Sequence, residues 1–574
     1  MTRAPTGWSV VSRLAMGTGI LAFAVGLPVA LHLSGTTDRS ATGALVMPVG
    51  SAISISEPLP ISQGLPLTIV SGSVVSVPGE RSSSGVVIDE AILKLDLSDR
   101  QAGSAPEALG PDAKPAPFPQ LAGFSADTVR LTRAVVGVIA PSGAAAQLED
   151  VNATITVSRK GSYKLVATGR LKNQPIAVDA FWSEAVTRDS AGRMPMKIVL
   201  RSPVLEALLD GHLKAQSKPQ FVGLAEFQIP SLRRFALWAG LGRGVGEQFR
   251  SIAVSGPIEW TSSHMAFSKA AISVNGNHAT GALTVKHGGG RLSLDGTLGF
   301  QELDLGRSWP ALAARSSEEA KEPHILSMLD ADLRLSATKV YAPAFEVGRA
   351  AVSIALSKGR LQADMAELDI EGGIAGGQLS LDLGQPSPKA NLKLRLKGVD
   401  AGRLLAAPLR RNALLGRANI TFEGTLGGRS LGEAFSTIAG RGSFDLVEPG
   451  RIGLDVNALV QAARSSGKVG WAAAGKNGTP VDTLSARYRL LDGALAIENL
   501  HARNPTSVFV GSGQLDVPAR LMDVRIAIGP PSAGEAPMTV HDILLLRGTW
   551  DAPAISLHPQ PKSQADAAAP VRAN

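Results

Sequence analysis

One short run in the chain has the residue types of a nucleophilic hydrolase. The run "GRSLG", centred on Ser430, fits the G-x-S-x-G pattern, which places a serine hydroxyl on a sharp strand-to-helix turn. His501, His541 and His558 follow it and could supply a base. The same serine has a second interpretation, because Ser430 and Glu433 form a capping box that opens the helix "LGEAFSTIAG". The sequence favours the cap, so we expect no catalytic residue and no enzyme.

The other residues able to do chemistry are scattered. The nine His stand singly, without the short spacings of metal ligands, and the absence of Cys excludes disulfides and thiolate sites. The run "KHGGGR" at 286–291 lacks the phosphate-loop pattern, so we interpret it as a hairpin turn. We therefore expect no metal and no cofactor. Four aspartates in similar apolar contexts are interpreted as solvent-facing strand residues: Asp96, Asp295, Asp382 and Asp516.

The composition indicates a folded chain with many turns. Hydrophobic residues make up 44% and charged residues 18%, which is unlike a disordered protein. The chain holds 62 Gly and 36 Pro, and its aromatic share of 4% predicts a mainly aliphatic core. The net charge is +8, but the basic residues are interspersed with acidic ones and form no long run. We therefore expect a mildly basic solvated surface and no nucleic acid partner.

Strands with two unlike faces dominate the pattern. In "LSLDGTLGF", at 292–300, leucine and phenylalanine lie on one face and polar residues on the other, as expected for a half-buried strand. The runs "LSLDL", "NLKLRLKG" and "VRIAI" repeat the alternation. The apolar positions of these four strands are our candidates for a binding face: Leu292, Leu294, Leu298, Phe300, Leu379, Leu381, Leu383, Leu392, Leu394, Leu396, Val524, Ile526 and Ile528.

Two small signatures recur among these strands. The first is Gly-x-Leu, which we interpret as a hairpin glycine followed by the start of an apolar face. Its glycines are Gly169, Gly281, Gly290, Gly359, Gly377, Gly493 and Gly513. The second is an apolar–Asp–apolar strand end before a short amphipathic run, at Asp304, Asp400 and Asp455. An aspartate there can cap the helix that follows.

The rest of the chain is assigned by periodicity. The runs from "DTVRLTRAVVGV" to "QPIAVDAFW" have a period of two and short joints, which predicts an antiparallel meander. Helix-type spacing appears in "SPVLEALLDGHL" and "PSLRRFALWAGLG". Strands are expected again from "VSGPIEW" to about residue 400, followed by a helix-and-loop section at 400–480 and a last set of strands.

The N-terminus contains a candidate membrane span. Residues 14–33 carry no Asp, Glu, Lys or Arg, and at 1.5 Å per residue they extend ~30 Å, the thickness of a hydrocarbon core. Arg3 and Arg13 precede the span and predict a cytoplasmic N-terminus. The alternative is a cleaved signal peptide, but no convincing A-x-A site follows. We expect an anchor, with everything after residue 35 on the far side.

Three blocks carry a resemblance to a known family. They combine glycine-punctuated strands with apolar and Asp positions, and they lie at 265–305, 414–459 and 479–528. In the second block, the positions that stand in a "G-x-I-x-G-x-D-L" type element are Gly450, Ile452, Gly453 and Asp455. Together with the anchor, these blocks resemble the AsmA family of Gram-negative envelope proteins, from about residue 250 to 555.

The resemblance implies a mainly β fold with short helices: an N-terminal transmembrane helix, then an extended antiparallel sheet curved into an apolar groove. It implies this division: 1–13 cytoplasmic N-terminus, 14–33 anchor, 34–250 β-rich periplasmic region ending in helical segments, 251–559 AsmA-like β domain, and 560–574 disordered tail. The implied function is support of outer-membrane biogenesis or lipid homeostasis from the bacterial inner membrane, by holding or transferring phospholipid. The alternative is a non-catalytic scaffold for outer-membrane assembly proteins.

The alternation leaves one question open. Acyl chains can bury an aliphatic face that protein leaves uncovered, at about 1.5–3 kcal/mol per side chain. The same residues would equally suit the core of a closed sandwich or barrel. Alternation cannot separate the two; the resemblance favours the open groove.

Overall fold

The computed structural model describes the greater part of the chain. Its residues are 52–56, 59–60, 67–78, 84–96, 128–139, 145–158, 162–183, 193–214, 220–240, 250–261, 263–288, 291–307, 329–342, 346–382, 389–409, 414–428, 433, 436–475, 477–516, 519–531 and 539–558. The expected anchor at 14–33, the expected tail at 560–574 and Ser430 lie outside these residues. Among the residues that the structure describes, no helix has both the length and the apolar character to span a membrane.

The described residues fall into two compact units. The first runs to Gly299 and includes Leu329–Ala331, and the second comprises Phe300–Arg307 and the residues from Asp332 onward. The domain boundary expected between residues 250 and 251 stays a prediction. Strands β11 (Gln220–Ile229) and β12 (Ile252–Trp260) pair across that position.

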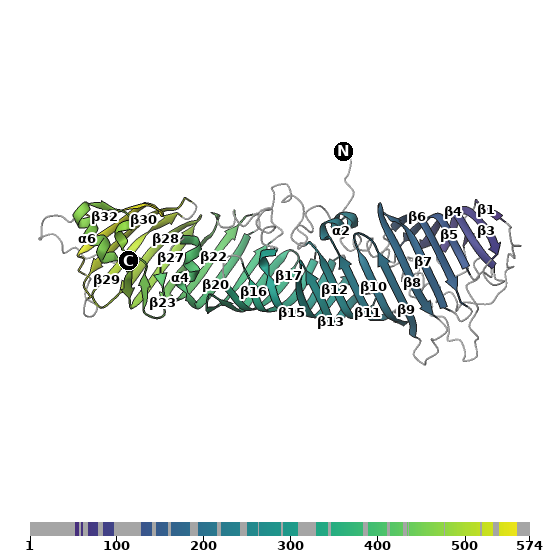
Figure 1. Ribbon diagram of the computed structural model, residues 1–574, viewed down its shortest axis with the longest axis horizontal. Coiled ribbons are helices and arrows are strands. Elements are labelled where there is room, and N and C mark those ends of the chain that lie inside the picture. Colours follow the sequence, from purple (N-terminus) through teal and green to yellow (C-terminus); the bar gives the residue numbers. More distant parts are fainter. Residues whose placement is uncertain are drawn as a thin grey trace. The chain divides into compact units, whose positions relative to one another are not determined.

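The first unit is built from long strands (Figure 1). They are β1 (Ala52–Ile55), β2 (Leu59–Pro60), β3 (Leu67–Pro78), β4 (Ser84–Asp96), β5 (Thr128–Ile139), β6 (Ala145–Val157), β7 (Ser162–Leu171), β8 (Gln174–Ser183), β9 (Arg193–Arg201), β10 (Glu206–Lys214), β11 (Gln220–Ile229), β12 (Ile252–Trp260), β13 (His264–Val274), β14 (Asn277–Gly288) and most of β15 (Arg291–Asp304).

Pairing in this unit follows chain order with one departure from antiparallel geometry. Strands β1 and β2 both pair with β3, and β5 to β14 pair each with the next in antiparallel register. The meander expected over β5 to β8 is therefore confirmed. Strands β4 and β5 are parallel, which requires the long connection at 97–127.

One short helix packs on the first unit. Helix α2 (Leu232–Ala239) begins after Ser231, whose hydroxyl accepts from the Arg234 backbone N–H, and ends at Gly240 with φ of 76°. The indole N–H of Trp238 donates to the carbonyl of Leu171 at 3.0 Å, which ties the helix to the end of β7. The helix expected in "PSLRRFALWAGLG" is thus confirmed.

The second unit repeats the long-strand architecture. Its strands are β16 (Leu329–Tyr341, from Asp332), β17 (Glu346–Ser357), β18 (Arg360–Ile370), β19 (Gly373–Asp382), β20 (Lys389–Asp400), β22 (Arg417–Gly427), β23 (Ala439–Leu446), β27 (Thr483–Leu491), β28 (Ala494–Arg503), β29 (Val508–Asp516), β30 (Leu521–Gly529), β31 (Asp542–Thr549) and β32 (Pro553–Leu557). From β17 on, each pairs antiparallel with the next in this series.

Small elements accompany this sheet. They are η2 (Leu305–Arg307), α4 (Ala401–Leu409), α6 (Val456–Ser466), η5 (Trp471–Ala474), β25 (Lys468–Val469), and a three-stranded sheet of β21 (Leu414–Leu415), β24 (Gly450–Ile452) and β26 (Thr479–Val481). Strand β25 pairs with β32 at two residues. The section at 400–480, expected as helix and loop, therefore also contains the sheet strands β22 and β23.

The aspartate signature is confirmed at all three positions. The Asp455 carboxylate accepts from the Ala458 backbone N–H at 2.9 Å and caps α6. Asp400 accepts from Arg403 at 3.0 Å in the first turn of α4, and Asp304 accepts from Gly306 at 2.9 Å beside η2. Asp304 and Asp400 end their strands, and Asp455 follows β24 (Gly450–Ile452) by three residues; each side chain accepts a backbone N–H of the element that follows.

The glycine signature is confirmed only in part. Gly359 and Gly493 lie in two-residue turns with φ of 78° and 77°, and each follows a residue with positive φ, as a type I′ hairpin requires. Four others lie within strands, against the hairpin expectation: Gly169, Gly281, Gly377 and Gly513. A Cβ at Gly377 would lie 2.1 Å from the carbonyl oxygen of Lys393, so glycine there permits close strand approach. Gly290 lies outside the described residues.

One helix expectation is wrong. The run "SPVLEALLDGHL" forms the strand β10 and not a helix. Ala207, Leu209 and Leu213 are buried at a period of two, and β9 and β11 pair with both edges of the strand. Hydrogen bonds from two neighbours outweigh the local preference of Leu and Ala for a helix.

The fold class is confirmed at its coarser level. Both units are mainly β with few short helices, and the sheets are open. β-bulges interrupt many of the pairings, for example between Met365 and Leu368 in β18 and between Leu396 and Val399 in β20. A bulge bends its strand locally and increases its twist.

Candidate functional site

Cross-strand register gathers the candidate residues of the second unit on one face. Leu379 lies opposite Leu392, and Leu394 lies opposite Phe422 on the next strand. Residues directly opposite each other share a face, and so do alternate residues of one strand. Strands β19, β20 and β22 therefore present one continuous apolar surface.

This surface continues on the same face of the sheet, strand by strand, from β20 to β30. The row that starts at Leu394 passes, strand by strand, through Phe422, Gly442, Tyr488, Ile497, Gly513 and Val524. A parallel row runs from Leu396 through Ile420, Phe444, Ala486, Leu500 and Gly511 to Ile526. We call this surface of the second unit the apolar face.

Two aromatic rings fill the places where the apolar face carries glycine. Tyr488 lies over Gly442, and Phe422 lies beside the facing pair Gly424 and Gly440. The Tyr488 hydroxyl donates to the carbonyl of Thr421 at 2.9 Å. Burial raises the pKa of Tyr488 to about 12, so the phenol is neutral at ordinary pH and adds no charge to this face.

Protein covers only part of the apolar face. Val456 and Leu459 of α6 and Val481 of β26 form one buried cluster with sheet residues that include Ile528. Val524 and Ile526 pack against this cluster. The candidates Val524, Ile526 and Ile528 therefore lie in a core that other parts of the protein cover, as the closed-core alternative expects for this region.

A second group of candidates lies beside α4. Leu396 is 6% exposed and forms a buried cluster with Ala375 and Val399. Leu394 of β20 and Leu404 of α4 pack against this cluster. The helix thus shields the end of β20 nearest the bulge.

Within the described part of the chain, no helix or short strand is recorded as packing over the remaining candidates on this face. Leu379, Leu381 and Leu392 are half-buried, and among the described residues none of them belongs to a buried cluster. Their side chains are flanked by other sheet residues and remain partly open to solvent. An aliphatic surface of this kind gains free energy from any apolar molecule that covers it. Leu383 lies outside the described residues.

The strand that carries the first four candidates spans the boundary between the units. Leu292 and Leu294 are half-buried in the first unit, where Leu298 is buried at 8% exposure. Phe300 belongs to the second unit and packs, with Leu303, against a cluster of Ala337, Val340 and Val347. Each group is described within its own unit.

The polar side of this strand lines a hollow of about 650 Å³ within the first unit. Asp295, expected on the solvent side, forms an ion pair with Lys286 at 2.9 Å. Arg291 pairs with Asp330 at 3.0 Å in the same region. Because each cation there has an acidic partner, the hollow offers balanced polar groups and no net charge for an ion.

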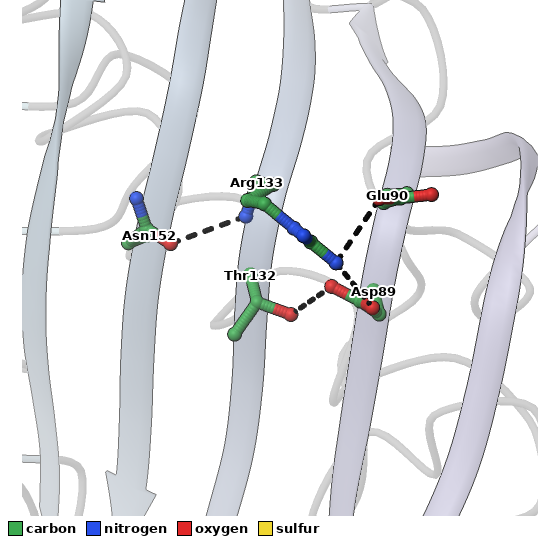
Figure 2. Close-up of polar contacts among 5 residues, drawn as sticks. All are labelled: Asp89, Glu90, Thr132, Arg133 and Asn152. Carbon is green, nitrogen blue, oxygen red and sulfur yellow. Dashed lines mark hydrogen bonds and ion pairs between the residues drawn. The ribbon is translucent and has the colours of Figure 1, made fainter.

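A separate polar cluster joins β4, β5 and β6 (Figure 2). Arg133 pairs with Asp89 and Glu90 at 3.0 Å each, and its backbone N–H donates to the Asn152 side chain at 3.1 Å. Thr132 donates to Asp89, and this hydrogen bond, followed by the contact with Arg133, lowers the pKa of Asp89. A carboxylate held ionised in this way is a poor base, so the cluster serves to link strands.

No group of three or more His, Asp or Glu side chains in the described ranges is placed to hold a metal ion. Ser430, on which the hydrolase interpretation rests, lies outside the described residues. Sequence reasoning missed the covering role of α6, although the apolar spacing of Val456, Leu459, Val460 and Ala463 in the sequence could have indicated it.

Comparisons with known proteins add no assignment. No model of a known protein family matches this chain, and no curated protein matches it. The resemblance to the AsmA family therefore stays a prediction that rests on the residues named above.

Proposed function

We propose that this protein holds phospholipid by its acyl chains on the uncovered part of the apolar face. Leu379, Leu381 and Leu392 carry the proposal, because they form a continuous aliphatic surface that protein leaves half-open. Each such side chain contributes about 1.5–3 kcal/mol when fully buried, so an acyl chain lying across several strands gains a useful affinity. The mechanism is passive, with tails on the leucines and headgroups in water.

The proposal includes a cellular setting. The apolar span at 14–33 anchors the chain in the bacterial inner membrane with its bulk in the periplasm. There the protein supports outer-membrane biogenesis or lipid homeostasis, in line with the AsmA resemblance. Its partners are phospholipid, the inner membrane and, in the wider pathway, outer-membrane assembly proteins.

The scaffold alternative finds less support in the sheet edge. Strand addition needs a long, free edge strand. The last strand, β32, is five residues long, begins with Pro553, and already pairs with β25 at Ile555 and Ser556. A short edge with proline and a partner is the usual way to prevent further pairing.

Lipid co-purification tests the proposal. The full chain, extracted in mild detergent, is analysed by mass spectrometry for bound phospholipid. We expect lipid in stoichiometric amounts with the natural chain and a loss of most of it in the double variant Leu379→Glu, Leu392→Glu, because two carboxylates would lie across the path of the tail.

The matched control uses a facing pair on the opposite side of the sheet, on β20 and its other neighbour β22. Asn391 and Thr425 are exposed cross-strand partners, and Asn391→Glu with Thr425→Glu adds the same charge. This control retains its lipid if the proposal holds. Equal lipid content in all three proteins, or none in the natural chain, contradicts it.

A further inference from the structure

Six cationic side chains gather on the face of the second unit's sheet that is opposite the apolar face. They come from β20, β23 and β27, and we call them the basic patch: Lys393, Arg395, Lys397, Arg441, Arg487 and Arg489. All six are exposed. Their alternation with the apolar residues of the same strands places them on the far side of the sheet.

The strand register aligns five of these residues in two rows, and Lys397 follows Arg395 two residues later on the same face of β20. Lys393 lies opposite Glu423, Glu423 opposite Arg441, and Arg441 opposite Arg489. The second row runs from Arg395 through Thr421 and Ser443 to Arg487. Because facing residues have Cα atoms about 4.5–5.5 Å apart, the six cations occupy one compact area.

Acidic side chains neutralise only part of this charge. Glu423 pairs with Lys393 at 3.0 Å and Glu498 pairs with Arg489 at 2.5 Å. The hydrogen bond and charge of Lys393, followed by the charges of Arg441 and Arg395, lower the pKa of Glu423, so it remains ionised and fixed in place. Asp445 is the next carboxylate along the face and lies opposite Ser485.

Among the described residues, three arginines of the basic patch have no carboxylate within ion-pair distance. In the part of the chain that the structure describes, Arg395, Arg441 and Arg487 form no ion pair. Like charges that face each other across strands, as Arg441 and Arg489 do, destabilise a sheet. A bound anion removes that repulsion.

The side chains between the arginines indicate the kind of anion. They are Thr421, Ser443 and Asn499, which are small and polar. Protein interfaces rely on aromatic or aliphatic anchors, and none lies between the arginines. Two exposed aliphatic residues lie at the margin of the patch, Ile374 opposite Lys397 and Leu491 two residues after Arg489. Guanidinium groups bind phosphate in a bidentate manner, and an exposed array of them on a sheet matches a surface of phosphates better than a single small ion.

We propose that the basic patch binds the phosphate surface of an anionic phospholipid membrane. This contact is independent of acyl-chain binding on the apolar face and would hold even if that face carried no lipid. The binding is electrostatic, so it requires anionic headgroups and weakens as salt is added.

Vesicle binding in trans tests this contact. The full chain is placed in nanodiscs of phosphatidylcholine, which occupy any membrane anchor with a neutral lipid. The discs are mixed with sucrose-loaded vesicles of phosphatidylcholine alone or with phosphatidylglycerol added, and the fraction that sediments is measured. We expect sedimentation with the anionic vesicles only, and its loss when salt is raised from about 0.05 to 0.5 M.

Two triple variants identify the surface responsible. Arg395→Gln, Arg441→Gln and Arg487→Gln together should weaken vesicle binding at least tenfold, because each cation near an anionic membrane contributes about a fivefold factor. The matched control removes three exposed arginines of the same unit outside the patch, with Arg334→Gln, Arg360→Gln and Arg503→Gln. It should bind nearly as well as the natural chain.

Several results would overturn the proposal. They are equal binding to neutral and anionic vesicles, equal loss in both triple variants, and binding to an acidic polypeptide such as polyglutamate in place of vesicles. The last result would indicate a protein partner. The Leu379→Glu, Leu392→Glu variant separates the two proposals, since it should lose co-purified lipid and keep vesicle binding.

Discussion

The hydroxyl of Tyr488 reaches across the glycine at position 442 and donates a 2.9 Å hydrogen bond to the backbone carbonyl of Thr421. The ring therefore spans from its own strand over β23 to β22, and it fills the space that the missing side chain of Gly442 leaves on the apolar face. Tyr488 thus links three strands and fills a gap in the apolar face, part of which we propose as the acyl-chain surface.

The partly buried phenol of Tyr488 predicts a loss of stability at alkaline pH. The folded protein raises the pKa of Tyr488 to about 12, above the value of about 10 in an unfolded chain. Its contribution is therefore fully present below pH ~10 and is lost as pH rises toward ~12. Since the chain contains 3 Tyr, absorbance near 295 nm resolves the titration. Tyr488→Phe should remove the late step, and an unchanged titration in that variant would refute the assignment.

The Arg133 cluster predicts an acid-sensitive contribution to stability. Thr132 and Arg133 lower the pKa of Asp89, so its contribution is present above the usual carboxyl range and is lost as pH falls through the lowered value. Asp89→Asn should flatten the dependence of the urea midpoint on pH between about 5 and 2. The control Asp523→Asn removes an exposed carboxylate that pairs with Arg547. An equal change in both variants would show that the Asp89 cluster has no special role.

Two glycines should respond differently to alanine. Gly372 has φ of 72° and open space around its Cβ position, so Gly372→Ala costs only backbone strain, about 1–2 kcal/mol. At Gly377 the added Cβ would lie 2.1 Å from the Lys393 carbonyl oxygen, and β19 and β20 must separate. Urea unfolding should therefore show the larger loss for Gly377→Ala. The reverse order would mean that the strands can separate at little cost.

The covered and uncovered parts of the apolar face should differ in their response to truncation. Leu459 of α6 is fully buried, so Leu459→Ala should cost ~2–5 kcal/mol in the free energy of unfolding. Leu392 is half-buried, and Leu392→Ala should cost ~1 kcal/mol in delipidated protein, measured by urea unfolding. Similar large losses at both sites would mean that Leu392 also lies in a closed core and would remove the basis for a lipid surface.

The local features of this fold could be predicted, and the long-range ones could not. Alternation identified many of the strands, although β10 was predicted as a helix and β22 and β23 were missed. The aspartates at 304, 400 and 455 identified the starts of short helical elements, because this signal lies within a few residues. The parallel pairing of β4 with β5 depends on residues that a long connection separates, so no local pattern contained it.

The candidate face shows the same limit. Sequence alternation correctly placed Leu392, Leu394 and Leu396 together, but it could not tell which of them α4 shields. It also read Val524 and Ile526 as equivalent to Leu379, although a helix 60 and more residues earlier in the chain covers their region. Coverage depends on how elements pack over the sheet, and that packing is set by tertiary contacts.

The order of strand pairing has a consequence for how this chain folds. Apart from β4 with β5 and β23 with β27, the long strands described in each unit pair with neighbours close in sequence, mostly through short turns. Such a sheet can grow by one hairpin at a time, with little loop entropy to overcome at each step. In a chain that emerges gradually from a ribosome or a secretion channel, each new strand could therefore pair with the last strand already folded, before the C-terminus has emerged. The slow steps would be the pairing of β4 with β5 and of β23 with β27, which close the long connections. Folding intermediates should accumulate before these two steps.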